Sequence, residues 1–309
     1  MKTILLASFI LPAALIANAQ KDTVWRKSGL LSLNLSQVSF TNWAAGGQNS
    51  GAGNAIVNYF AGYKRGKIVW DNYIDLGYGL LMQGRDARLI KSDDKIDLTS
   101  KFGRQASKYW YYSVYANFRS QFAAGYNYPN DSVVISKFFA PAYITLGPGM
   151  DYKPGKNFSL FLSPASVRFI FVEDKALSDK GAFGVDPGKK VKTELGALLK
   201  AIYNKDISAN INLKTSLDLY SNYLDKPQNI EVNWQMLLGL KVSKFISASL
   251  SAQLLYDDKT KLTFYKSDGV TVDHVGPGTQ FKEVIGIGFA YKFTSYGTRL
   301  TPAIFSILQ

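Results

Sequence analysis

Apolar and polar side chains alternate with a period of two along most of this chain. In the segments 31–36, 211–219 and 246–254, leucine, isoleucine, alanine or threonine occupies every second position, and serine, asparagine, glutamine, lysine or aspartate lies between. Because strand side chains point to opposite faces in turn, each segment has one apolar and one polar face. Several such stretches exceed ten residues, whereas a soluble β-sandwich needs strands of only about 5–6. The pattern favours a barrel with lipid outside and water inside.

The pattern predicts an all-β fold, a single antiparallel transmembrane β-barrel of about 12 strands. The predicted strands are 29–38, 52–63, 67–82, 93–105, 109–122, 140–152, 157–170, 190–203, 210–223, 230–243, 246–257 and 281–293. The connections alternate in length. The short ones are 64–66, 106–107, 153–156, 204–206 and 243–245, and the longer ones are 39–51, 83–92, 123–139, 171–189, 224–229 and 258–280. Outer-membrane barrels have this asymmetry, with short periplasmic turns and long extracellular loops.

The beginning of the chain reads as an export signal. Lys2 precedes an apolar segment at 4–16 and an Ala17-Asn18-Ala19 cleavage site, so we expect residues 1–19 to be a signal peptide. The apolar segment is shorter than the roughly 20 residues that span a bilayer as a helix. We therefore expect a mature barrel at 20–293 in the outer membrane of a Gram-negative bacterium, followed by a C-terminal tail at 294–309.

The last predicted strand carries an assembly signal. Phe289, Tyr291 and Phe293 share one face, and the strand ends in Tyr-x-Phe. This ending resembles the closing strand that the bacterial barrel assembly machinery recognises, which makes that machinery an expected partner. Aromatic residues such as Trp70 and Trp110 flank the short turns, where we expect a girdle at the membrane–water interface.

Composition narrows the function classes. The chain has no cysteine, so disulfides cannot hold an exported protein of this size together, whereas a closed hydrogen-bonded barrel can. Its net charge is +13, but the lysines are dispersed and form no clustered stripe for nucleic acid. We interpret the charge as suited to outer-membrane lipid and lipopolysaccharide, with no nucleic-acid partner.

Charged residues occupy many positions that face inward in this register. Buried charges without partners would cost several kcal/mol, so these must be paired or hydrated. Two arrangements stay open, a packed ionic plug and a narrow water-filled pore. The lumen-lining candidates are Asp71, Asp75, Lys95, Asp97, Lys101, Arg119, Lys200, Lys214, Asp218, Glu231, Lys241 and Lys282.

The loops carry few chemical signals. Asn42, Trp43, Gly46 and Gly47 could form a ligand-contacting platform or a structured turn at the barrel mouth. The acidic pairs at 93–94 and 257–258 lack the spacing of a Ca²⁺ loop and are expected to be solvated. The single histidine, His274, has no serine at a matched position. We expect no catalytic residues, no cofactor and no metal.

Several motifs resemble a Bacteroidetes family of outer-membrane proteins, domain of unknown function 3078. The first is Leu33-Asn34-Leu35-Ser36-Gln37-Val38-Ser39 followed by Thr41-Asn42-Trp43-Ala44-Ala45-Gly46-Gly47. The others are KSDDK at 91–95, GYNYPND at 125–131, FFAPAY at 138–143, GAFGV at 181–185, NYL at 222–224 and VNW at 232–234. The family has no assigned activity, so the resemblance implies a fold and a location but no site.

The sequence therefore predicts an outer-membrane barrel that is not an enzyme, acting as a narrow porin-like channel or as a component of the envelope. One alternative is a non-conducting structural or partner-binding barrel. A less favoured alternative is an enzyme of the outer-membrane phospholipase type, which would require a serine hydroxyl beside His274.

Overall fold

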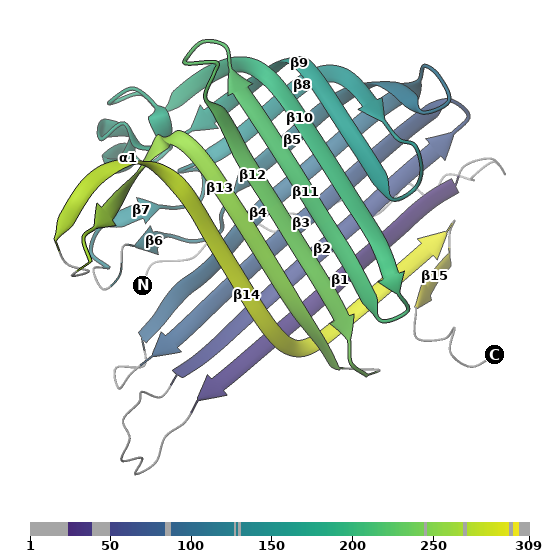
Figure 1. The fold of residues 1–309 in the computed structure, drawn as a ribbon, viewed down its shortest axis with the longest axis horizontal. Coiled ribbons are helices and arrows are strands. Elements are labelled where there is room, and N and C mark those ends of the chain that lie inside the picture. Colours follow the sequence, from purple (N-terminus) through teal and green to yellow (C-terminus); the bar gives the residue numbers. More distant parts are fainter. Residues whose placement is uncertain are drawn as a thin grey trace, which may run out of the picture.

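The computed structural model describes residues 24–38, 50–83, 88–126, 128, 131–243, 246–267, 271–296 and 299–302. Twelve antiparallel strands close into a barrel (Figure 1), because β1 pairs with β2 on one side and with β14 on the other. The ring consists of β1 (Val24–Val38), β2 (Ser50–Arg65), β3 (Ile68–Gln83), β4 (Arg88–Gln105), β5 (Trp110–Ser120), β8 (Ala142–Tyr152), β9 (Phe158–Phe171), β10 (Val191–Ser208), β11 (Ile211–Asn222), β12 (Ile230–Lys241), β13 (Ile246–Tyr265) and β14 (Val272–Tyr296). The predicted fold class is confirmed.

Alternation decides which side chains form the wall of the barrel and which fill it. On β1, Leu33 and Leu35 are exposed on the outside, Leu35 at 62%, whereas Ser32 and Asn34 are buried inside. On β14, Ile285 is 75% exposed and Phe289 61% exposed on the same outer wall. Apolar side chains so exposed are costly in water. The barrel thus has an apolar outside and a polar inside.

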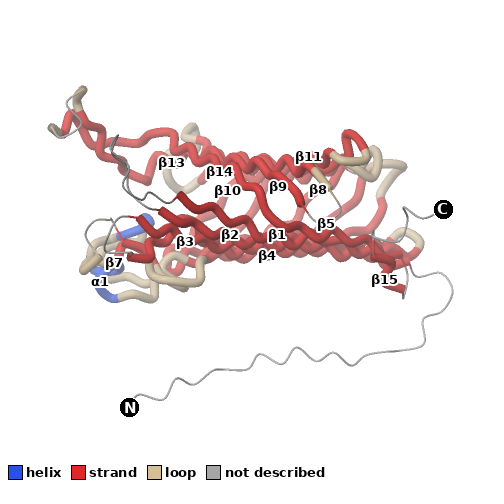
Figure 2. Tube along the Cα trace, turned by 90° about the horizontal axis from the view of Figure 1, so that it is seen from below, coloured by secondary structure: helices blue, strands red, loops and turns tan. Residues whose placement is uncertain are grey.

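The two ends of the barrel differ. The turns between β2 and β3, β4 and β5, β8 and β9, β10 and β11, and β12 and β13 are short and lie at one end, where β1 begins and β14 ends. Gly66 has a φ of 53° in the first of these turns, a conformation that glycine adopts at little cost. The opposite end carries the hairpin of β6 (Gly125–Tyr126) and β7 (Val134–Ser136), the helix α1 (Lys175–Asp179), and the 3-10 turn η1 (Ala182–Gly184). Figure 2 shows the β13–β14 hairpin projecting beyond the barrel at that end.

The structure differs from the prediction mainly in strand length. The segment 258–280, expected to be a loop, is largely strand, since β13 continues to Tyr265 and β14 begins at Val272. Gly276, Pro277 and Gly278 lie within this added strand, at or beside the point where the pairing of β13 and β14 is irregular. At the other end, β14 continues to Tyr296 and pairs with β15 (Arg299–Pro302), within the segment expected to be a tail. The predicted signal peptide lies outside the described residues.

The closure of the barrel is incomplete along its length. β1 pairs with β2 over its whole length, from Val24 to Val38, but pairs with β14 only from Arg26 to Asn34. Within the described residues, the part of β14 before Gly288 pairs with β13 alone. Figure 1 shows β14 running beside β1 and then bending away from it. The first and last strands are therefore joined toward the short-turn end and separate toward the long-loop end.

Candidate functional site

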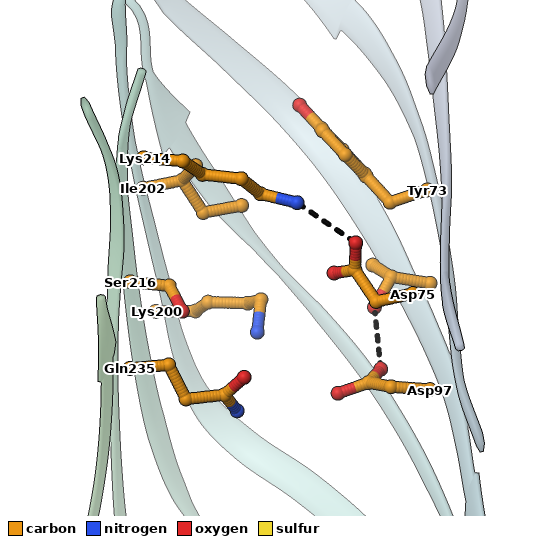
Figure 3. A pocket seen from close by; sticks show the side chains of 9 residues that line it. Tyr73, Asp75, Asp97, Lys200, Ile202, Lys214, Ser216 and Gln235 are labelled. Atoms are coloured by element: carbon orange, nitrogen blue, oxygen red, sulfur yellow. Dashed lines mark hydrogen bonds and ion pairs between the residues drawn. The ribbon is translucent and has the colours of Figure 1, made fainter. Parts of the chain in front are cut away.

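Side chains from opposite walls meet across the lumen. Lys214 on β11 donates to Asp75 on β3 over 2.8 Å, and Lys95 on β4 donates to Gln235 on β12 over 2.6 Å. These strands are not neighbours in the sheet, so both contacts span the interior. Figure 3 shows Lys214 and Gln235 projecting from one wall and Asp75 from the facing wall. The contacts therefore bridge the lumen rather than only lining it.

The space left between these side chains is small. A cavity of about 20 Å³ remains beside the Lys214–Asp75 pair, which is room for about one water molecule. Lys200, on its edge, donates to Asp218 over 2.7 Å. All residues around the cavity except Ile202 carry a polar side-chain group; they are Tyr73, Asp75, Asp97, Thr99, Lys200, Ile202, Lys214, Ser216 and Gln235. Around this cavity, side chains from opposite walls are paired, as the packed ionic plug requires.

A second ionic cluster lies toward the short-turn end. Lys101 on β4 donates to Asp151 over 2.8 Å and to the Ser159 hydroxyl over 2.6 Å. Lys153 joins the same cluster through ion pairs to Asp71 and to Asp151. All five side chains point inward from β3, β4, β8 and β9, or from the turn between the last two. This cluster joins β3, β4, β8 and β9 near the short turns.

A third cluster lies toward the long-loop end. Glu194 on β10 has no exposed surface and accepts from Lys259 over 2.6 Å. Glu231 accepts from Lys259 over 2.9 Å and from Arg168. Arg168 also lies 3.5 Å from Glu194, and Lys192 lies 3.7 Å from it. Each carboxylate therefore has two or more cationic partners, which is the condition for keeping buried charges ionised.

The connection between β9 and β10 packs at the mouth above this cluster. Its helix α1 begins at Asp174, whose carboxylate accepts from the Leu177 backbone N–H. The hydrogen bond from Lys137, together with that N–H, lowers the pKa of Asp174. An apolar cluster holds the connection to the strand ends, and consists of Ala140, Ile170, Val172, Leu177 and Val185. Gly184 in η1 lies beside Lys192 and Lys259, so this loop folds over the ionic cluster.

The remaining predicted residues are placed as follows. Asp97 accepts from Asn117 over 2.7 Å, and the Arg119 guanidinium lies 5.6 Å from the centre of the Tyr143 ring. Lys282 pairs with Asp93 over 2.7 Å, and Lys241 is exposed at the end of β12. Phe289, Tyr291 and Phe293 alternate along the outer face of β14. The loop candidates Asn42, Trp43, Gly46 and Gly47 lie outside the described residues.

The expectation that the acidic pairs are solvated is wrong. Asp93 pairs with Lys282, and Asp94 pairs with Lys91 over 2.9 Å and accepts from two backbone N–H groups. Asp258 accepts from Asn229, and Asp257 accepts from the backbone N–H of Lys259. The carboxylates were expected near the ends of the predicted strands 93–105 and 246–257, but β4 begins earlier and β13 ends later, which brings cationic and amide donors beside them.

Sequence reasoning included Glu231 but missed the other residues of the third cluster, among them Arg168, Glu194 and Lys259. Arg168 was missed because the pairing of β9 with its neighbours shifts near Pro164, so positions 161 and 168 both face inward. Lys259 lies in a similar irregularity of β13, between Tyr256 and Lys261. Glu194 could have been predicted to face the lumen, since it lies six positions before Lys200 on the same strand, and residues an even number of positions apart face the same side.

The single histidine, His274, lies near the start of β14. His274 contacts Asp273 over 2.8 Å and stacks on Phe264 with ring centres 4.5 Å apart. Among the residues with described positions, no serine hydroxyl is bonded to it, and no group of three or more histidine, cysteine or acidic side chains could hold a metal ion. No helix in the described part of the chain is long and apolar enough to cross a membrane.

The chain is similar to one protein family and to several solved structures. A family described as a protein of unknown function, DUF3078, matches residues 35–126, which supports the resemblance over that stretch. No curated protein matches the sequence. Similar solved structures include an outer membrane channel from Pseudomonas putida F1, with 13% identity and a TM-score of 0.35, covering 92% of this chain and 100% of that one. The translocator domain of the autotransporter NalP from Neisseria meningitidis has 10% identity and a TM-score of 0.33, with 89% and 90% covered.

Proposed function

We propose that this protein is an integral outer-membrane barrel whose lumen is closed, acting as a structural or partner-binding component of the envelope. The Lys214–Asp75 pair carries this proposal, because it bridges β11 and β3 through the middle of the lumen. A narrow channel is the second candidate. The lumen contains many polar and charged side chains, and the bridging lysine side chains are long enough to move aside.

The location rests on the apolar outer wall. Side chains such as Leu33, Leu35 and Ile285 are unfavourable in water and match a lipid environment. Export would depend on the signal peptide at 1–19 and insertion on the barrel assembly machinery. The motif resemblance favours a bacterium of the Bacteroidetes as the source. Lipid and lipopolysaccharide are the expected surroundings, and a catalytic role is not proposed.

Labelling of single cysteines tests this location and orientation. Cysteines replacing Asp131 and Asp186, in the long-loop end, are expected to react with a membrane-impermeant maleimide on intact cells. Cysteines replacing Gly66 and Gly155, in the short turns, should react only after the outer membrane is permeabilised. Strong labelling of Gly66→Cys on intact cells would contradict the orientation, and equal labelling of all four in a soluble fraction would contradict the membrane location.

Planar-bilayer recording distinguishes the closed barrel from the channel. The unmodified protein is expected to give no steady single-channel steps. Removing both bridges with Asp75→Ala, Lys214→Ala and Lys95→Ala should produce steps, since these side chains span the lumen. The control Lys175→Ala removes an exposed ion pair in α1 and should remain silent. Regular steps from the unmodified protein would instead favour the narrow channel.

A further inference from the structure

Exposed cations gather at the short-turn end of the barrel. Those in or beside the β2–β3 and β4–β5 turns include Arg65, Lys67, Arg104 and Lys108. None of these four has an ion-pair partner among the described residues. The only exposed carboxylate in the described part of this end is that of Asp206, which already pairs with Lys292 over 2.6 Å. The short-turn end therefore carries positive charge that no carboxylate of the described chain neutralises.

The two arginines lie in one row across the outer wall. Arg65 on β2 lies opposite Ile68 on β3, and Ile68 lies opposite Arg104 on β4. The row faces outward, because Arg65 lies an even number of positions after Ala55, the partner of the outward Leu33. Neighbouring strands are about 4.8 Å apart, so the two arginine backbones lie about 10 Å apart, on either side of Ile68. Both guanidinium groups can therefore reach one group that lies over Ile68.

An aromatic row lies directly beside the arginine row, one step nearer the middle of the barrel. Tyr63, Trp70 and Phe102 lie opposite one another on β2, β3 and β4, each two positions from the arginine row and on the same outward face. Trp70 is 41% exposed and Phe102 49% exposed. Tryptophan and tyrosine concentrate where a membrane meets water. The arginine row thus lies at the level of the lipid head groups.

The two rows together suit an anionic amphiphile. A phosphodiester accepts paired hydrogen bonds from guanidinium groups, which makes arginine the best side chain for holding it at a surface. The surplus positive charge repels a head group that carries its own ammonium and attracts one with a net negative charge. The exposed rings of Trp70 and Phe102 offer an apolar surface to the chains of such a molecule.

We propose that Arg65 and Arg104 hold the phosphate of an anionic phospholipid from the leaflet at the short-turn end. The phosphate lies over Ile68, and the acyl chains lie against Trp70 and Phe102. This site goes beyond the closed-barrel function and rests on the proposed membrane location.

Native mass spectrometry of the full chain tests the site. The protein is inserted into vesicles of equal parts phosphatidylglycerol and phosphatidylcholine with the same acyl chains, extracted in a mild detergent, and weighed with its bound lipids. Phosphatidylglycerol is expected to be retained at least about fivefold more than phosphatidylcholine, because its head group has a phosphate and no ammonium. Arg65→Gln combined with Arg104→Gln should bring this preference close to one, since glutamine lacks the charge.

A matched double variant separates the site from net charge. Lys64→Gln combined with Lys241→Gln removes two exposed cations from the same end. Their strand positions face inward, because Lys64 lies opposite the buried Val69 and Lys241 lies opposite Ser247. This variant should keep the preference for phosphatidylglycerol. Equal loss in both double variants would overturn the site, as would an undiminished preference without the two arginines.

A soluble head group separates lipid from free phosphate. Excess glycerol phosphate, added before extraction, should not displace the retained phosphatidylglycerol, because it has no chains to contact Trp70 and Phe102. Displacement would overturn lipid as the occupant and show that a free phosphate ester binds. Insertion without any lipid preference would overturn the site alone, whereas failure to insert into vesicles would overturn the membrane location and the site with it.

Discussion

Replacing Glu194 with glutamine is expected to lower the free energy of unfolding by about 3–5 kcal/mol, because it removes one of the two carboxylates that neutralise the buried Lys259 and Arg168. Glu194 has no exposed surface and contacts Lys259, Arg168 and Lys192. Glutamine keeps the shape of the side chain, so packing changes little. Urea unfolding in lipid vesicles, followed by tryptophan fluorescence, measures the loss.

The matched control is an exposed ion pair in the connection between β9 and β10, close to Glu194 in the sequence. Glu173 and Lys190 lie 3.0 Å apart with about half of each side chain exposed. Glu173→Gln should change stability by at most about 1 kcal/mol, since solvent screens an exposed pair. Equal losses for both variants would show that the Glu194 cluster is hydrated rather than buried, and would favour a water-filled lumen over the plug.

Placing arginine at Leu250 should cost about 2–4 kcal/mol in a bilayer, because that side chain faces lipid near the middle of the part of β13 that pairs with β12. Leu250 lies between Leu238 and Ile285 on the outer wall. The neighbouring substitution Ser249→Arg should cost much less, since Ser249 faces the lumen between Gly239 and Gly286. A side chain at Gly239 would meet no atom within 4 Å, so an arginine has room there.

Folding measurements on this pair test the register as well as the membrane. Equal stability of the two variants in lipid vesicles would contradict the assignment of β13 faces. A native protein that stays folded and monomeric in buffer without lipid or detergent would contradict the membrane location, even if Leu250→Arg is destabilising. Arginine at Ser216 would be a poorer control for Leu250→Arg, because Ser216 lines the small cavity next to Lys214 and the arginine would meet that lysine.

All twelve strands of the ring could be predicted because their signal is local. Alternation along a strand such as β11 depends only on neighbouring residues and on which face meets lipid. Where a strand shifts register, the signal fails. Near Pro164 the positions of β9 that face inward change, so alternation counted from the start of the strand does not place Arg168 in the lumen.

Whether the lumen is open could not be predicted from alternation. Lys214 and Asp75 are 139 residues apart, and their contact depends on the width of the closed barrel. Alternation predicts that both side chains point into the lumen, but it does not predict that they are close enough to form an ion pair.

The partial joint between β1 and β14 has a kinetic consequence. It brings together the two ends of the ring, Arg26 and Tyr296, whereas every other pairing in the ring joins strands that are consecutive or separated by one hairpin. Closing so long a loop is entropically costly before any contact stabilises it. We therefore expect this joint to form last during folding. Being short, it is also the place where thermal opening begins, with Leu35–Val38 exchanging their amide protons sooner than the middle of β9.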